Sequence, residues 1–261
     1  MKWRVALLAL PMAAIPSVWA EVSVSHAEAM SIGRKIWQNE CGGTIAGLTS
    51  WNAGEDFASL GIGHFIWYPA GRRGPFEESF PAFLHFAEQH GAKLPEEVMA
   101  RSDAPCPWNS RAEFLATQSS ARMKTMRKFL ADTIDLQAQF LVERLHHALP
   151  RMLDSAPPGE RDRVRQNFQV VASTARGCYA LVDYVNFKGE GVLATERYQG
   201  LGWGLLQVLE GMPATTDGEA GRKKFADSAA RVLRERVERS PAERHEKRWL
   251  PGWLNRVATY R

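Results

Sequence analysis

The stretch WQNECGGTIAGLTSWNAGEDFASLGIGHF, residues 37–65, decides the fold of this chain. It begins in a helical pattern, because apolar side chains recur at helix-like spacing within residues 26–39 and Glu40 closes that run. Within residues 42–68, Gly, Thr, Ser and Asn alternate with single aromatic and aliphatic side chains, which is typical of short strands joined by turns. The stretch predicts a helix followed by a small sheet.

Helical patterns dominate the rest of the chain. A Pro- and Gly-rich loop at 69–81 and a second irregular stretch at 102–109 interrupt them. Residues 111–153 are helical almost throughout, with one apolar stripe at helical spacing: Ile134, Leu141, Leu145, Leu149 and Met152. Further helices are predicted at 80–90, 161–173, 175–187, 197–211, 218–239 and 242–259. The predicted fold class is therefore mainly α (α+β), in a single domain.

The first twenty residues, MKWRVALLALPMAAIPSVWA, have the features of a secretory signal peptide. A short basic start precedes an apolar run from Val5 to Ile15, and small residues precede a cleavage site after Ala20. The run is too short for a permanent anchor, so we expect no stable membrane insertion after cleavage; a retained N-terminal anchor is the alternative. We predict a periplasmic or secreted protein with residues 21–261 as the mature domain.

The signal peptide carries half of the net charge. The whole chain has 33 Lys and Arg against 29 Asp and Glu, a formal charge of +4. Removing Lys2 and Arg4 leaves 31 basic residues and a formal charge of +2. No stripe of basic residues interleaved with aromatic residues stands out, so we expect no nucleic-acid partner. A content of 45% hydrophobic and 24% charged residues excludes a largely disordered or low-complexity chain.

The cysteines and histidines do not form an obvious framework. Cys41, Cys106 and Cys178 allow one disulfide with one thiol left over, in any of three pairings, or three small buried side chains. None of them lies in a zinc-binding spacing, and the adjacent His146 and His147 point to different faces of a helix. We therefore expect no dedicated metal site.

Side chains suited to chemistry gather in the opening stretch. Glu55 and Asp56 follow Glu40, and Gly61 and Gly63 lack a Cβ atom, so backbone or a ligand can approach them closely. Aromatic faces beside carboxylates suit sugar rings and can raise a carboxyl pKa toward a general-acid role; those nearby are Trp37, Trp51, Phe57, Phe65, Trp67 and Tyr68. Two carboxyl groups facing one glycosidic bond are what hydrolysis needs. The simpler alternatives are core packing for the aromatic residues and a solvated surface position for each acid.

A helix-terminal Glu, a hairpin region and then SLGIGH at residues 59–64 resemble the phage-type lysozymes, the endolysin muramidases. Two later stretches are loosely similar to that family's central helix and C-terminal segment: CYALVDYVNFKGEG at 178–191 and RSPAERHEKRWLPGWLNRVATY at 239–260. The firm similarity covers residues 31–68. The resemblance implies a lysozyme-like helical domain whose small hairpin sheet lines a cleft. Residues 69–173 have no counterpart in the family and form an expanded helical middle region.

The resemblance also implies roles for individual residues. Glu40 matches the family's general acid, Ser59 stands where a Thr helps to hold the attacking water, and His64 matches a structural His. The second acid stays open, because adjacent strand residues point to opposite faces and only one of Glu55 and Asp56 can face the cleft; we favour Glu55. The residues expected to contact substrate are Gly61, His64, Trp51, Trp67 and Glu190.

Glu190 is also part of a second candidate acid site. It precedes GLLQ at 204–207, which is similar to the GLMQ of transglycosylases and goose-type lysozymes, although their Glu lies farther ahead of the motif. An apolar helix that matches by chance is the simpler explanation. An intermediate interpretation places Asn186, Lys188 and Glu190 on the far wall of the cleft.

The resemblance implies a monomeric, inverting glycoside hydrolase that cleaves peptidoglycan glycan strands without a cofactor. A first alternative is a hydrolase or lytic transglycosylase acting on another amino-sugar polymer, such as chitin or chitosan. A second is a catalytically inactive glycan-binding protein of the envelope. If neither hairpin acid faces the cleft, Glu40 acts as an acid with an unassisted water, or the protein binds glycan without cutting it.

Overall fold

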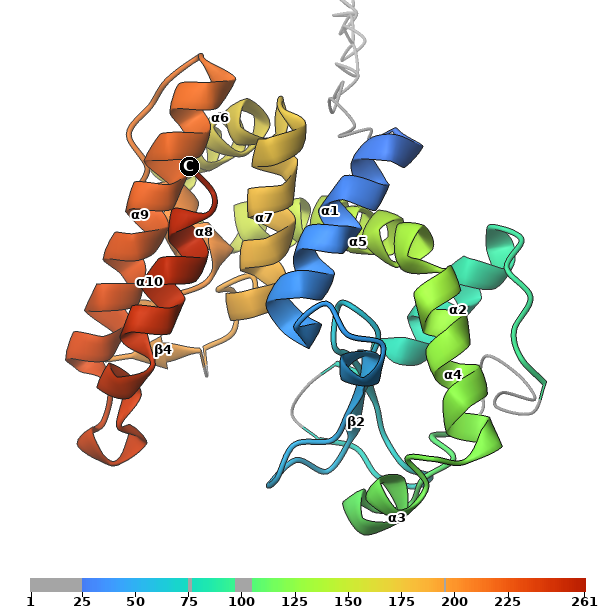
Figure 1. The fold of residues 1–261 in the computed structure, drawn as a ribbon. Coiled ribbons are helices and arrows are strands. Elements are labelled where there is room, and N and C mark those ends of the chain that lie inside the picture. Colours follow the sequence, from blue (N-terminus) through green and yellow to red (C-terminus); the bar gives the residue numbers. More distant parts are fainter. Residues whose placement is uncertain (1–24, 75–76, 97–104, 195) are drawn as a thin grey trace, which may run out of the picture.

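A computed structural model describes residues 25–74, 77–96, 105–194 and 196–261, so the predicted signal peptide lies outside the described residues. The chain is mainly helical, as predicted (Figure 1). Its helices are α1 (His26–Cys41), α2 (Phe80–Gln89), α3 (Arg111–Ala116), α4 (Ala121–Asp132), α5 (Ile134–Ser155), α6 (Arg161–Ala172), α7 (Ala175–Lys188), α8 (Leu205–Glu210), α9 (Gly218–Arg239) and α10 (Leu250–Ala258). Its strands are β1 (Thr49–Ser50), β2 (Ala58–Leu60), β3 (Phe65–Trp67), β4 (Arg197–Tyr198) and β5 (Leu201–Gly202).

Helix α1 carries Glu40 in its last turn. A capping box starts the helix: the Ser25 side chain accepts a hydrogen bond from the Glu28 N–H, and the Glu28 carboxylate accepts one from the Ser25 N–H. Gly42 follows the helix with φ of 60°, a left-handed conformation that Gly adopts without steric cost and that ends helices. These local signals set where the helix begins and ends, and so they place Glu40 in its last turn.

The small sheet follows α1, as predicted. Its three antiparallel strands lie in the order β1-β2-β3. Ser59 pairs with Ser50 on one side and with Ile66 on the other. Directly opposed residues of antiparallel strands project to the same face, so these three side chains share one face of the sheet.

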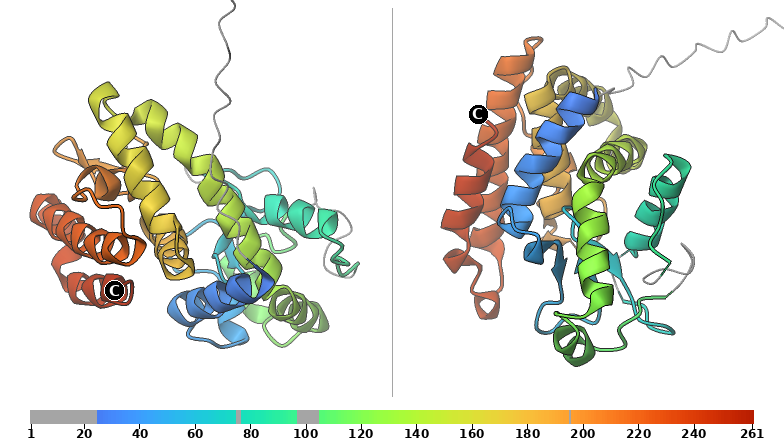
Figure 2. Two further views of the ribbon diagram at one scale, coloured as in Figure 1. Left: turned by 90° about the horizontal axis from the view of Figure 1, so that it is seen from above. Right: turned by 45° about the vertical axis from the view of Figure 1, so that its right-hand side comes forward.

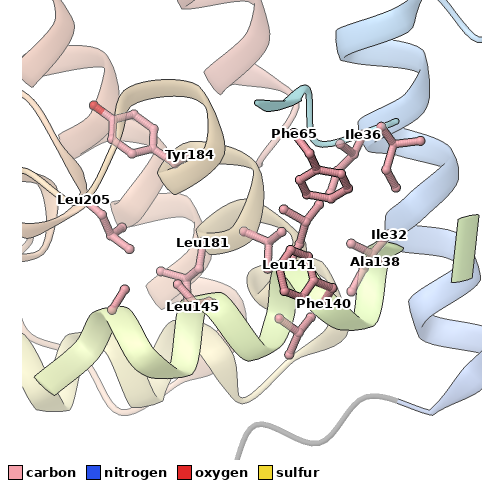
Figure 3. Packing of buried hydrophobic residues seen from close by; sticks show 14 of the residues in the cluster. Ile32, Ile36, Phe65, Ala138, Phe140, Leu141, Leu145, Leu181, Tyr184 and Leu205 are labelled. Carbon is pink, nitrogen blue, oxygen red and sulfur yellow. The ribbon is translucent and has the colours of Figure 1, made fainter. Parts of the chain in front are cut away.

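Helix α5 lies at the centre of the molecule (Figures 1 and 2). It packs against α1, α2, α6 and α7, and all five members of its predicted apolar stripe are buried. Figure 3 shows Ala138, Leu141 and Leu145 of this helix among side chains of α1, α7, α8 and the β3 strand. The middle region, 69–173, thus supplies the helix around which the core forms.

The remaining helices lie on two sides of α1 and α5. Helices α6, α7, α8, α9 and α10 pack on one another at one side, while α2, α4 and the three-stranded sheet lie at the other (Figure 1). Seen from above, α1 and α5 lie between these two groups (Figure 2). Among the described residues, none of the helices combines the length and the apolar character needed to cross a bilayer.

Two predicted helices are wrong in part. The prediction at 197–211 fails over its first half, where β4 and β5 form a hairpin before α8. Gln199 and Gly200 have φ of 50° and 80°, the two positive values of a tight hairpin turn. The prediction at 242–259 fails over its first half too, since two 3-10 turns, Ala242–Arg244 and Glu246–Arg248, precede α10. His245 between them has φ of 51° and interrupts the helical path.

The cysteines are three separate thiols. Cys41, Cys106 and Cys178 are all buried, and none of them forms a disulfide. Of the two possibilities that the sequence left open, the structure shows three small buried side chains. Burial raises the pKa of each thiol to about 12, so none of them is a reactive thiolate near neutral pH.

Candidate active site

A pocket of about 700 Å³ opens beside the end of α1. Residues of α1, β3, α5 and α7 line it, together with the turn before β3, the segment between β3 and α2 and the loop after α7. Six of them are charged: Glu40, Glu77, Arg144, Arg151, Glu190 and Glu196. Its apolar wall includes Ile66, Leu141 and Phe187. Apolar surface with a few converging polar groups is the usual composition of a small-ligand site.

The Glu40 carboxylate is largely enclosed, with 14% of its side chain exposed. It accepts a hydrogen bond from the Arg256 guanidinium. Asn186 Nδ2 lies 3.5 Å from its Oε1, and His64 Nδ1 lies 3.6 Å from its Oε2. A carboxylate at a helix C-terminus faces the negative end of the helix dipole, so the Arg256 charge offsets an unfavourable position.

Arg256 also forms an ion pair with Asp183 of α7. Its Nε and Nη2 donate to the two Asp183 carboxylate oxygens at 2.8 and 2.9 Å. Asp183 is fully buried and also accepts from the Tyr260 hydroxyl, at 2.5 Å, and from Asn39 Nδ2. Burial lowers the pKa of Arg256, but the hydrogen bonds and charge of Asp183 outweigh it and raise that pKa overall. Arg256 is therefore a fixed cation beside Glu40.

His64 joins the end of α1 to the GIGH turn. Its Nδ1 faces Glu40, and its Nε2 lies 3.9 Å from the Cys41 sulfur. The order thiol, imidazole, carboxylate has the appearance of a nucleophilic triad, but the raised pKa of the buried Cys41 thiol leaves no thiolate for one. His64 Nδ1 thus lies beside the Glu40 carboxylate, and the structural role expected for His64 stays a prediction.

Both glycines of the GIGH turn lie close against protein side chains. A Cβ atom on Gly61, whose φ is 73°, would collide with the Gln137 side chain of α5. Gln137 Oε1 accepts a hydrogen bond from the Ile62 N–H at 2.8 Å, so this close approach fastens the turn to the central helix. A Cβ on Gly63 would lie 2.5 Å from the Phe65 ring. Gly63 lines the pocket, whereas Gly61 is buried away from it.

The structure does not bring the hairpin acids to Glu40. Glu55 and Asp56 lie in the connection between β1 and β2, and neither lines the pocket. Asp56 is exposed, 4.0 Å from Arg72, while Glu55 Oε2 is buried without a hydrogen-bond partner among the described residues. Ser59 lies on the same sheet face as Ile66, which lines the pocket, although Ser59 itself is buried.

The aromatic residues of the opening stretch pack in the core. Trp51 is buried, donates from its indole to the Glu55 carbonyl at 2.7 Å and packs near Phe114. Trp67 is fully buried against Phe80. Neither lines the Glu40 pocket, so the aromatic side chain that the pocket offers comes from α7, as Phe187.

The predicted far wall is present in part. Asn186 and Glu190 line the pocket, and Glu190 pairs with Arg151, whose Nε lies 3.0 Å from its Oε2. Lys188 instead packs over the Trp253 ring, 3.4 Å from its centroid, where burial lowers its pKa to about 6. In the GLLQ motif, the Gln207 side chain binds the Gly204 N–H and the Gly191 carbonyl, so it holds the loop after α7 in place.

Four charged residues of the pocket were missed by sequence reasoning: Glu77, Arg144, Arg151 and Glu196. Arg144 and Arg151 are seven residues apart on α5, a helical spacing that puts both on one face. The sequence shows that the two arginines share one face of α5. Which part of the molecule that face contacts depends on how α5 packs. Glu196 lies between two predicted helices, in a segment where no local pattern shows which way a side chain points.

Three comparisons, with protein-family models, with curated proteins and with solved structures, found no match to this chain. Among the described residues, no group of three His, Cys, Asp or Glu side chains is placed to hold a metal ion. The chemistry of the pocket is therefore inferred from its own residues.

Proposed function

We propose that this protein is an exported glycoside hydrolase with a lysozyme-like fold that cleaves the glycan strands of peptidoglycan. The observation that carries the proposal is the Glu40 carboxyl group, enclosed at the end of a helix and directed into a pocket with apolar and polar walls. The order of a helix-terminal Glu, a small antiparallel sheet and a GIGH turn supports the lysozyme-like assignment.

Glu40 acts as the proton donor to the glycosidic oxygen. Asn186, His64 and Arg256 contact its carboxyl group from three different elements, so its orientation is set before substrate binds. Preorganised groups of this kind lower a barrier because they need no rearrangement during the reaction.

Dye release from labelled peptidoglycan tests the proposal. We expect release by the wild type and a loss of about 100-fold or more in Glu40→Gln, which keeps the shape of the side chain but removes the proton donor. Glu88→Gln, an exposed substitution on α2, is the matched control and should behave like the wild type. Equal release by wild type and Glu40→Gln would remove Glu40 from catalysis.

The same assay separates the alternatives. Release from chitin or chitosan, but not from peptidoglycan, would favour another amino-sugar polymer. Binding of these glycans without release would favour the inactive glycan-binding protein. Reducing-end products indicate hydrolysis, whereas anhydro-sugar products would indicate a transglycosylase.

A further inference from the structure

The pocket holds three carboxylates besides Glu40, and two of them have cationic partners. Glu77 is mostly exposed and lies 3.9 Å from Arg144. Glu190 is engaged by Arg151 through both of its carboxylate oxygens. The ion pairs of the described chain do not include Glu196, which instead accepts a hydrogen bond from the Gly191 N–H. Among the described residues, Glu196 is thus the carboxylate of this pocket that forms no ion pair with an arginine.

Glu196 and Glu40 contact neighbouring positions of α7. Glu196 Oε1 lies 3.1 Å from the place that a Cβ atom would take on Gly189, at the C-terminal end of that helix. Glu40 Oε1 lies 3.5 Å from the side chain of Asn186. Gly189 caps α7 and Asn186 lies in its last turn, so both carboxylates approach the C-terminal end of this helix. Both carboxylates also line the same pocket.

The surroundings of Glu196 make it a stronger base than an ordinary carboxylate. Burial raises the pKa of its carboxyl group, and the charge of Glu190 raises it further, while the Gly191 N–H and Arg236 act in the opposite direction. A general base works best when its pKa lies near the working pH, so a raised carboxyl pKa favours proton abstraction from water.

We propose that Glu196 is the second catalytic carboxylate of this pocket, the general base that activates the attacking water; this rests on the proposed glycosidase function. The water oxygen forms a bond to the anomeric carbon as the bond from that carbon to the glycosidic oxygen breaks. Glu196 takes the proton that the water loses, and Glu40 gives a proton to the leaving oxygen. The new reducing end has inverted configuration, and such a pair of carboxyl groups works at a separation of about 6.5–9.5 Å.

Kinetics on soluble peptidoglycan fragments test this assignment. We expect Glu196→Gln to lower kcat by about 100-fold or more with KM changed by less than about threefold, because a general base acts on the chemical step. Glu55→Gln tests the rival acid of the hairpin and should keep kcat within about threefold, because Glu55 lies outside the pocket. The opposite pattern, with kcat lost in Glu55→Gln and kept in Glu196→Gln, would overturn the assignment.

Azide rescue separates a catalytic role from a structural one. In Glu196→Ala, azide fits the space left by the carboxylate and attacks the anomeric carbon without losing a proton, while Glu40 still protonates the leaving oxygen. We expect azide to restore activity and to yield a glycosyl azide. An inactive, folded Glu196→Ala that azide does not rescue would assign Glu196 a structural role and overturn the proposal.

The pH profile gives a further readout. Removing the Glu190 charge, as Glu190→Gln, lowers the pKa of Glu196 and leaves Arg151 free to lower it further. A base must be deprotonated to work, so the acid limb of kcat/KM should move to lower pH; an unchanged limb contradicts the assignment. If the wild type releases nothing, the proposed function and this proposal both fall. If only Glu40→Gln is inactive, the glycosidase stands and Glu196 is excluded.

Discussion

The two walls of the pocket differ in how they use their residues. The wall formed by the hairpin and the GIGH turn contains the residues most conspicuous in the sequence, yet its glycines, aromatic residues and Ser59 are mostly packed against other protein groups. The wall formed by α5, α7 and the loop after α7 looks ordinary in sequence, yet it supplies Arg144, Arg151, Asn186 and Glu196. A motif can therefore hold a site in shape while less distinctive segments carry its charges.

Helix α1 connects the two walls. It ends at the hairpin in sequence, but the Glu40 carboxylate is held mainly from other helices, by Arg256 of α10 and Asn186 of α7. We therefore expect substitutions in the hairpin to lower mainly the stability of the protein, and substitutions around the loop after α7 to lower mainly its activity. Stability measurements on variants of both regions test this difference.

The largest effect on stability is expected at Arg256 of α10, which pairs with the buried Asp183 of α7. Arg256→Met leaves the fully buried Asp183 without its cation, which should lower the free energy of unfolding by about 3–5 kcal/mol. Urea denaturation measures this loss. Lys128→Met removes the exposed pair with Asp132 and should cost no more than about 0.5 kcal/mol. A loss under about 1 kcal/mol in Arg256→Met would show that Asp183 does not depend on Arg256.

In the hairpin wall, the GIGH turn should tolerate little change. Gly61→Ala places a Cβ at positive φ and against Gln137, and we expect it to lower the free energy of unfolding by about 2–4 kcal/mol. Gly54 also has positive φ, but nothing lies near its Cβ position, so Gly54→Ala isolates the backbone cost, about 1 kcal/mol. Equal losses in the two variants would mean that contact with Gln137 does not set the need for glycine.

A further effect concerns pH and Lys188. Burial lowers the pKa of this amine to about 6, with Arg236 adding to the effect and Glu246 opposing it. Between pH 6 and the ordinary range of a lysine, the unfolded chain binds the extra proton, so stability should rise with pH in that window. The slope difference from Lys188→Met is at most about 1.4 kcal/mol per pH unit. Parallel urea midpoints from pH 6 to 9 in both proteins would contradict the lowered pKa.

Much of the fold could be predicted from periodicity and end signals. The ranges of α1, α2, α7 and α9 and the position of the small sheet agree with the sequence pattern, because each has apolar spacing and a clear cap or turn at its ends. The β4–β5 hairpin was missed, although Gly200, Gly202 and Gly204 in succession favour turns over a helix. The apolar residues between and after these glycines were interpreted as part of a helix instead.

The site was predictable only in part. Glu40, His64 and Glu190 line the pocket, as expected from the sequence, whereas Glu55, Asp56, Trp51 and Trp67 do not. Contacts between residues as distant as Glu40 and Arg256, or Ile62 and Gln137, depend on how the helices pack, and a single sequence does not encode that packing in any local pattern. The middle region shows the same limit, because its length was evident but its central position was not.

The structure of Glu40→Gln bound to a peptidoglycan tetrasaccharide would show where the glycan binds and which carboxylates flank the scissile bond. We expect the glycan to lie in the pocket, with a glycosidic oxygen within hydrogen-bonding distance of the residue-40 side chain. We also expect the Glu196 carboxylate beside the same anomeric carbon, on the face opposite the leaving oxygen. A glycan bound along the hairpin beside Glu55 and Asp56, with the pocket empty, would contradict both expectations.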